Sequence, residues 1–170
     1  MLSRPLRLAL IVAATGFGLF RVLSGEASGW LYLVAAAAFA VGLFRNNSVT
    51  LAYRAFVAGD SGRASVLLGQ VPDPVRLSRQ DRAYFHWVAG QLAGTAGQYR
   101  EAYQHLAIAA SGGLRSSHIR AATECSLAEA ALGLGDLPLA RSHFERARAL
   151  PSRDTLKPVI AGLASRLGSA

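Results

Sequence analysis

The sequence is poor in cysteine, in lysine and in charged residues generally. Cys125 is the single cysteine, so no disulfide can form within the chain, which suits a reducing compartment. Charged residues make up only 16% of the chain and hydrophobic residues 52%, an apolar balance for a domain of 170 residues. The hydrophobic excess is not evenly spread, and its location indicates how the chain is organised.

Clusters of basic residues and metal-ligand spacings are also missing. The net charge is +8, which is typical of proteins that bind nucleic acid, an anionic membrane surface or acidic partners. The basic residues form no run that would indicate a nucleic-acid-binding patch. The histidines have no metal-ligand spacing among themselves or with Cys125, and His105 and His143 are expected on outer helix faces. We therefore expect no enzyme, no cofactor and no metal site.

The hydrophobic excess lies in two stretches near the N-terminus. The second, residues 27–44, has no charge and would span about 27 Å as a helix, close to the ~30 Å core of a bilayer. The first, residues 6–23, reaches a similar length if Arg7 and Arg21 place their charged groups at the interfaces. A short connection containing Gly25 and Gly29 joins them. The pattern predicts a transmembrane helical hairpin over residues 1–45.

The flanking charges predict the orientation of this hairpin. Arg4 and Arg7 precede the first stretch, and Arg45 and Arg54 follow the second. Because cytoplasmic flanks are enriched in basic residues, both termini are expected in the cytoplasm of a bacterium, with two spans in the inner (plasma) membrane. Three alternatives remain: the first stretch could be a cleaved signal peptide, both stretches could be buried helices of a soluble protein, or the hairpin could lie in a larger assembly and shield another subunit.

The rest of the chain repeats with a fixed period of about 38 residues, the spacing from Gly59 to Gly97 and from Gly97 to Gly135. Small or large apolar residues recur in register on either side of these glycines. Each copy predicts a helix, a glycine turn and a second helix, over about 46–72, 78–110 and 116–150. Residues 152–170 predict a capping helix with an apolar stripe of Leu156, Ile160 and Leu163.

These residues resemble the tetratricopeptide repeat (TPR) family over residues 46–151. The resemblance implies an all-α fold in which three helix pairs form an α-solenoid. The period is about four longer than the usual 34 of that family, and Ser48, His86 and Glu124 stand where it has a large residue. The positions that pack the repeats are Ala52, Ala64, Leu68, Gly90, Ala102, Leu106, Ala128, Ala140, Phe144 and Ala147.

In the TPR family, the first helices of the pairs line a groove that binds proteins. The register implies that the groove here is formed by Asn46, Val49, Tyr53, Phe56, Tyr84, Trp87, Gln91 and Glu129. Its aromatic members are either anchors for a partner or packing residues against the hairpin or between units. The family's clamp for C-terminal carboxylates has no counterpart at these positions.

The sequence therefore predicts a membrane-anchored, TPR-like protein–protein interaction module that recruits or scaffolds a partner at the inner membrane. The alternative is a structural accessory or assembly subunit of a larger membrane complex, which docks through its transmembrane hairpin. Binding of anionic lipid or nucleic acid by scattered arginines is a third and less favoured interpretation.

Overall fold

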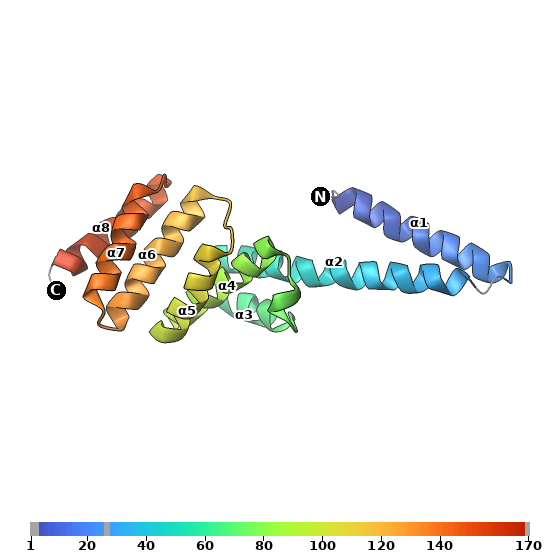
Figure 1. Ribbon diagram of the computed structural model, residues 1–170, viewed down its shortest axis with the longest axis horizontal. Helices are drawn as coiled ribbons and strands as arrows, with labels where there is room; N and C mark the ends of the chain where they lie inside the picture. Colours follow the sequence, from blue (N-terminus) through green and yellow to red (C-terminus); the bar gives the residue numbers. More distant parts are fainter. Residues whose placement is uncertain (1–3, 26–27, 169–170) are drawn as a thin grey trace. The chain divides into compact units, whose positions relative to one another are not determined.

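In a computed structural model, the chain is helical throughout the part that is described, residues 4–25 and 28–168, and no strand occurs there. Side chains are described for residues 12–25, 28–38 and 48–168. The chain divides into two compact units, Met1–Asn47 and Ser48–Ala170. The elements, shown in Figure 1, are α1 (Arg4–Leu23), α2 (Gly29–Val57), α3 (Ser61–Gly69), η1 (Pro74–Arg76), α4 (Arg79–Thr95), α5 (Tyr99–Ser111), α6 (Ser117–Gly133), α7 (Leu137–Ala149), η2 (Asp154–Leu156) and α8 (Lys157–Gly168).

The first unit contains α1 and the beginning of α2, which pack closely next to their connection. A methyl group added at Gly29 would lie 2.6 Å from Val22 Cγ2, and one added at Gly18 would lie 3.0 Å from Tyr32 Cβ. The rings of Phe17 and Tyr32 meet edge to face with their centres 5.1 Å apart. A side chain at Gly29 would therefore collide with the backbone of α1, and one at Gly18 would be a tight fit against α2.

The prediction of two membrane spans is not supported by the described residues. Among them, no helix is both long enough and apolar enough to cross a bilayer. Residues 6–11 of the first predicted span and 39–44 of the second lie outside the residues whose side chains are described.

In the second unit, the helices repeat at the period seen in the sequence. Helices α4 and α6 both have 17 residues, and their first residues, Arg79 and Ser117, are one repeat period apart. Helices α5 and α7 both have 13 residues, and the same period separates their first residues, Tyr99 and Leu137. The end of α2 and α3 form a shorter first pair. The chain from residue 48 onward is thus a helical repeat of the α-solenoid type (Figure 1).

One turn joins the two helices in every pair. Gly59, Gly97 and Gly135 have φ values of +86°, +74° and +80°, a conformation that glycine adopts without steric cost. The residue after each glycine, Asp60, Gln98 or Asp136, donates its backbone N–H to the carbonyl five residues earlier, at N···O distances of 2.9, 2.9 and 3.0 Å. This hydrogen bond caps the C-terminal end of the first helix. Asp60 and Asp136 then cap the second helices by accepting bonds from backbone N–H groups.

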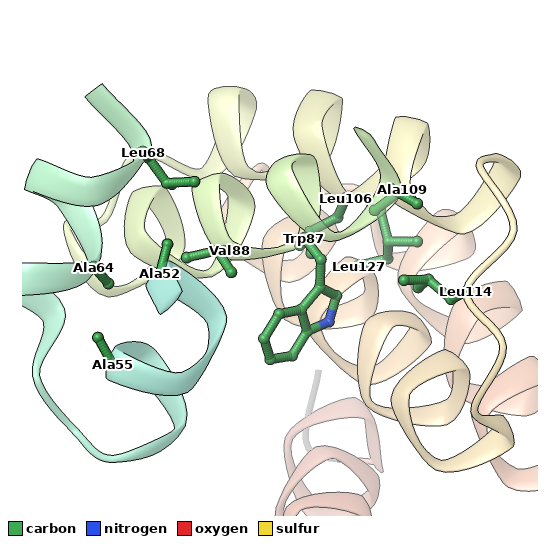
Figure 2. Close-up of a cluster of buried hydrophobic side chains, with 11 residues drawn as sticks. Ala52, Ala55, Ala64, Leu68, Trp87, Val88, Leu106, Ala109, Leu114 and Leu127 are labelled. Carbon is green, nitrogen blue, oxygen red and sulfur yellow. The ribbon is translucent and has the colours of Figure 1, made fainter. Parts of the chain in front are cut away.

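The predicted packing positions are all buried in the second unit. All six alanines among them are 0% exposed, and Leu106 is 1% exposed. A methyl group added at Gly90 would lie 2.7 Å from Leu106 Cγ and 3.2 Å from the Ala102 carbonyl oxygen. Small residues therefore recur because the helices of a pair touch almost backbone to backbone. Figure 2 shows the core that they form around Trp87, Val88 and Leu106.

Each helix of this unit packs chiefly on the helices next to it in the chain, from α3 to α8. Helix α8 closes the series against α6 and α7. Leu156 and Leu163 of the predicted stripe are buried there with Leu167, whereas Ile160 is half-buried. The opposite side of α8 is exposed, as expected of a cap with a solvated outer surface.

Candidate functional site

The first-helix face is the surface formed by the predicted groove residues on α2, α4 and α6. One position of the face is buried in every helix pair. It is occupied by Val49 in the first pair and Trp87 in the second, which are 1% and 7% exposed, and by the equivalent residue of the third pair, Cys125, which is 1% exposed. These three residues are one repeat period apart and point into the core. Their role in this structure is packing, so the solvent-accessible surface of the face is formed by the other positions.

The accessible positions lie on either side of the buried one. Tyr53, Phe56, Tyr84 and Gln91 are half-buried, and Glu129 is exposed. Tyr53, Gln91 and Glu129 are separated by one repeat period, so they hold equivalent positions on the three first helices. Asn46, the remaining predicted groove residue, lies outside the residues whose side chains are described.

Four aromatic rings from α2 and α4 form one cluster at one end of the face. Tyr53 meets Tyr84 edge to face, with ring centres 5.3 Å apart, and lies 5.5 Å from Trp87. Phe56 is perpendicular to Trp87 at 5.6 Å. Burial raises the pKa of the Tyr84 hydroxyl, and Tyr53 adds to this while Arg115 opposes it. Tyr53 and Phe56 thus pack on buried Trp87, Tyr84 packs on Tyr53, and these three rings remain partly open to solvent.

The other end of the face is polar. Gln91 Nε2 donates to Ser126 Oγ at 2.8 Å, and Ser126 in turn donates to the Ala122 carbonyl. Glu129 Oε1 lies 3.9 Å from Arg166 Nη1 on α8. Gln91, Ser126 and Glu129 also line a small cleft of about 140 Å³ between α4, α5 and α6. The face therefore presents aromatic rings on α2 and α4 and the negatively charged carboxylate of Glu129 on α6.

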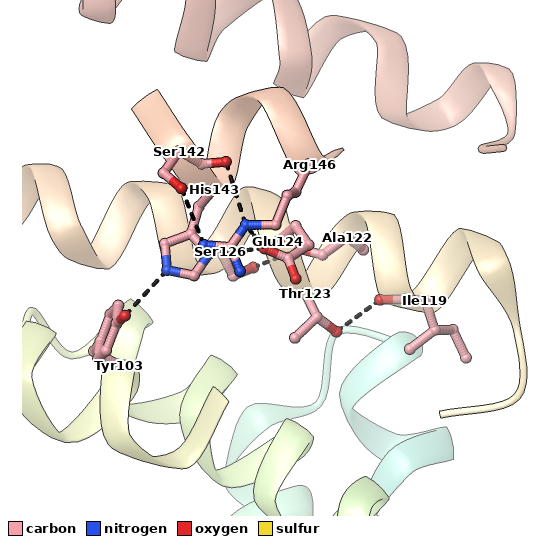
Figure 3. Close-up of polar contacts among 9 residues, drawn as sticks. All are labelled: Tyr103, Ile119, Ala122, Thr123, Glu124, Ser126, Ser142, His143 and Arg146. Carbon is pink, nitrogen blue, oxygen red and sulfur yellow. Dashed lines mark hydrogen bonds and ion pairs between the residues drawn. The ribbon is translucent and has the colours of Figure 1, made fainter. Parts of the chain in front are cut away.

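A buried polar chain connects α5, α6 and α7 (Figure 3). Nδ1 of His143 lies 2.7 Å from Oε2 of Glu124, and Nε2 lies 3.0 Å from the Tyr103 hydroxyl. An ionised carboxylate only accepts, so Nδ1 of His143 donates the hydrogen bond to Glu124. The prediction that His143 lies on an outer helix face is wrong, because it is 5% exposed and faces α5 and α6.

The preceding helix pair has a related contact at the same two positions. His86 and His105 stand one repeat period before Glu124 and His143, and their Nδ1 atoms are 2.9 Å apart. In this contact one Nδ1 must donate a hydrogen bond and the other must accept it. Burial lowers the pKa of His86, and neighbouring His105 and Arg82 lower it further. Both contacts clamp a first helix to its second helix. Comparing positions across repeats could have found them from the sequence.

Neither the histidines nor the cysteine shows the setting of a reactive centre. Within the described residues, no group of three or more histidine, cysteine, aspartate or glutamate side chains could hold a metal ion. Burial raises the pKa of the Cys125 thiol to about 11, and the nearby carboxylates of Glu129 and Glu124 contribute. A thiol with that pKa is a packing group at neutral pH, because only the thiolate is nucleophilic.

Comparison with known proteins assigns no relatives: no protein-family model, curated protein or solved structure matches the chain. The likeness to the TPR family therefore rests on the repeated residues and helix pairs described above.

Proposed function

We propose that this protein is a membrane-anchored, TPR-like interaction module that recruits or scaffolds a protein partner at the inner membrane, without enzymatic activity of its own. The observation that carries the proposal is the first-helix face. It places the partly exposed ring of Tyr53 and the polar groups of Gln91 and Glu129 at equivalent positions of successive helices, with the rings of Phe56 and Tyr84 beside them. That regular presentation suits an extended or helical protein segment that contacts several repeats at once.

The aromatic end supplies the affinity in this proposal. Tyr53, Phe56 and Tyr84 are held by contacts with one another and with buried Trp87. Rings that are already fixed lose little conformational entropy on binding, and aromatic residues are frequent binding hot spots. Glu129 and Gln91 would add selectivity for a segment that carries a basic residue or a hydrogen-bond donor.

The hairpin supplies the location in this proposal. Several of its described apolar side chains are largely exposed, including Val12 at 71%, Phe20 at 67%, Leu23 at 79% and Leu31 at 72%. Exposed apolar surface of this kind favours burial in lipid or against another protein. With both termini in the cytoplasm, tethering would raise the effective concentration of the repeats near other membrane proteins, so modest affinity would suffice.

The test uses two variants with the same change of charge. Gln91→Lys with Glu129→Lys alters the first-helix face, and Gln104→Lys with Glu145→Lys alters exposed positions on second helices. Tagged full-length protein is extracted in mild detergent, and co-purifying proteins are quantified by mass spectrometry. We expect the partner with the wild type and the second-helix variant, and its loss with the face variant. Equal recovery with all three proteins would contradict the proposal.

The second candidate function is that of an accessory subunit that docks through the hairpin. The same exposed apolar side chains favour it, because neighbouring transmembrane helices could cover them as well as lipid could. Replacing residues 1–45 with an unrelated two-span anchor separates the two functions. An interaction module would keep its partner after the exchange, whereas an accessory subunit would lose it.

A further inference from the structure

A second hollow, here called the α5–α7 cavity, lies between α5, α6 and α7. Its volume is about 380 Å³, and its lining includes Ala110, Arg120, Glu124, Arg146, Ala149 and Leu150. Small-molecule sites occupy roughly 300–1,000 Å³. No residue of the first-helix face lines this cavity, so any ligand there would be separate from the proposed protein partner.

Two arginines give the α5–α7 cavity a positive side. Arg120 comes from the first turn of α6 and makes no ion pair with any described residue. Arg146, from the last turn of α7, donates from Nη2 to Ser142 Oγ at 3.1 Å, and its Nε lies 3.9 Å from Glu124. Guanidinium groups match the planar geometry of a carboxylate and bind it strongly.

Glu124 provides an opposite charge in the same cavity. Its Oε2 is bonded to His143, whose other ring nitrogen is held by Tyr103. Within the described part of the chain, Oε1 has no bonding partner. The polar chain of Figure 3 therefore fixes the carboxylate and leaves one oxygen able to accept a bond from a ligand. Ala110, Ala149 and Leu150 supply apolar surface beside these charges.

We propose that the α5–α7 cavity binds a free α-amino acid with an aliphatic side chain. Arg120 and Arg146 would hold its carboxylate, Glu124 Oε1 would accept from its ammonium group, and its side chain would lie against Ala110, Ala149 and Leu150. The two charges of such a ligand meet opposite charges, and its apolar part meets apolar atoms. An inorganic anion would use only the arginines.

The test titrates full-length protein in detergent with L-alanine, L-valine, L-leucine and L-isoleucine by calorimetry. Two analogues of leucine are included: 4-methylpentanoate lacks the ammonium group, and 3-methylbutylamine lacks the carboxylate. We expect saturable one-to-one binding of at least one amino acid. Each analogue should bind about tenfold or more weakly than leucine, since it lacks one of the two charge-assisted contacts.

Two arginine variants complete the test. Arg120→Ala should lower the affinity about tenfold, because it removes one carboxylate contact. Arg148→Ala is the matched control, since Arg148 is also an exposed arginine but does not line the cavity. Absence of saturable binding for all four amino acids would overturn the proposal, as would equal affinity of the Arg120→Ala variant or of either analogue. The face variant Gln91→Lys with Glu129→Lys should still bind, which keeps this outcome distinct from that of the proposed function.

Discussion

Nδ1 of His143 lies 2.7 Å from Oε2 of Glu124, and this contact holds the same place in its helix pair that the His86–His105 contact holds in the pair before. The sequence period therefore repeats a polar contact as well as the apolar packing. In both pairs the contact joins the middle of the first helix to the middle of the second. The chemistry differs because a carboxylate has replaced one imidazole, and the contact in the third pair is the more deeply buried.

Glu124→Ala should destabilise the protein by about 2–3 kcal/mol, because it leaves the buried Nδ1–H of His143 without an acceptor. The measurement is urea unfolding of the full-length protein followed by circular dichroism. The control is Glu101→Ala, whose carboxylate is 56% exposed and lies 3.8 Å from His105. That variant should remain within about 0.5 kcal/mol of the wild type. Equal losses in both variants would refute a special role for the buried contact.

Two glycines of α4 should respond in opposite ways to alanine. At Gly90 the added methyl would lie 2.7 Å from Leu106 Cγ, so Gly90→Ala should lose about 1–3 kcal/mol through overpacking. At Gly94 the nearest atom is Ala102 Cβ at 3.9 Å, so Gly94→Ala should gain up to about 1 kcal/mol from helix propensity. Thermal unfolding of the two variants tests the pair. A stabilising Gly90→Ala would show that the helices do not approach as closely as described.

Stability should fall as the pH drops below the ordinary pKa of histidine. The folded state lowers the pKa of His86, through burial first and then through His105 and Arg82. The unfolded chain therefore takes up a proton at a higher pH than the folded chain, and acidification favours unfolding. His86→Asn should reduce the loss of stability between pH 7.5 and pH 5, measured as the urea midpoint at each pH. An unchanged loss would mean that other groups cause it.

Cys125 should resist thiol reagents in the native protein. Its pKa of about 11 leaves few thiolates at pH 8, and its side chain is 1% exposed. Labelling with a chromogenic disulfide reagent should therefore be slow in buffer and fast in denaturant. Rapid and complete labelling of the folded protein at pH 8 would show that this part of the core opens readily.

Trp87 should matter for stability. Trp87→Ala is expected to cost about 3–5 kcal/mol, because it leaves a cavity among Tyr53, Phe56 and their neighbours. Trp87→Phe should cost less, because it keeps an aromatic ring and removes a buried indole N–H that has no hydrogen-bond partner among the described residues. Unfolding free energies of the two variants test this. If Trp87→Ala were as stable as the wild type, the ring would not be a core residue.

Much of the repeat could be predicted from the sequence because its signal is local and periodic. Glycine at 59, 97 and 135 predicts the turns, and the small residues in register predict which surfaces meet. The depth of each residue on the first-helix face is less predictable. Val49 and Trp87 lie on the predicted side of their helices, but they are buried whereas their neighbours on the face are partly exposed. Their burial depends on how closely successive helix pairs stack.

The polar features were harder to predict, for a different reason. His143 looks like a surface residue when its helix is considered alone, since histidine is often exposed. Its burial depends on Tyr103 and Glu124, which lie 40 and 19 residues away in the chain. The α5–α7 cavity likewise combines residues of three helices, and no motif in the sequence joins them.

The central claim is that a protein partner binds the first-helix face, and site-specific photo-cross-linking in cells tests it most directly. A photoreactive amino acid is placed at Gln91 on α4 in one version of the protein and at Gln104 on α5 in the other. The account predicts that one cross-linked protein forms from position 91 and is absent from position 104. The same cross-linked protein from both positions, or from position 104 alone, would contradict it.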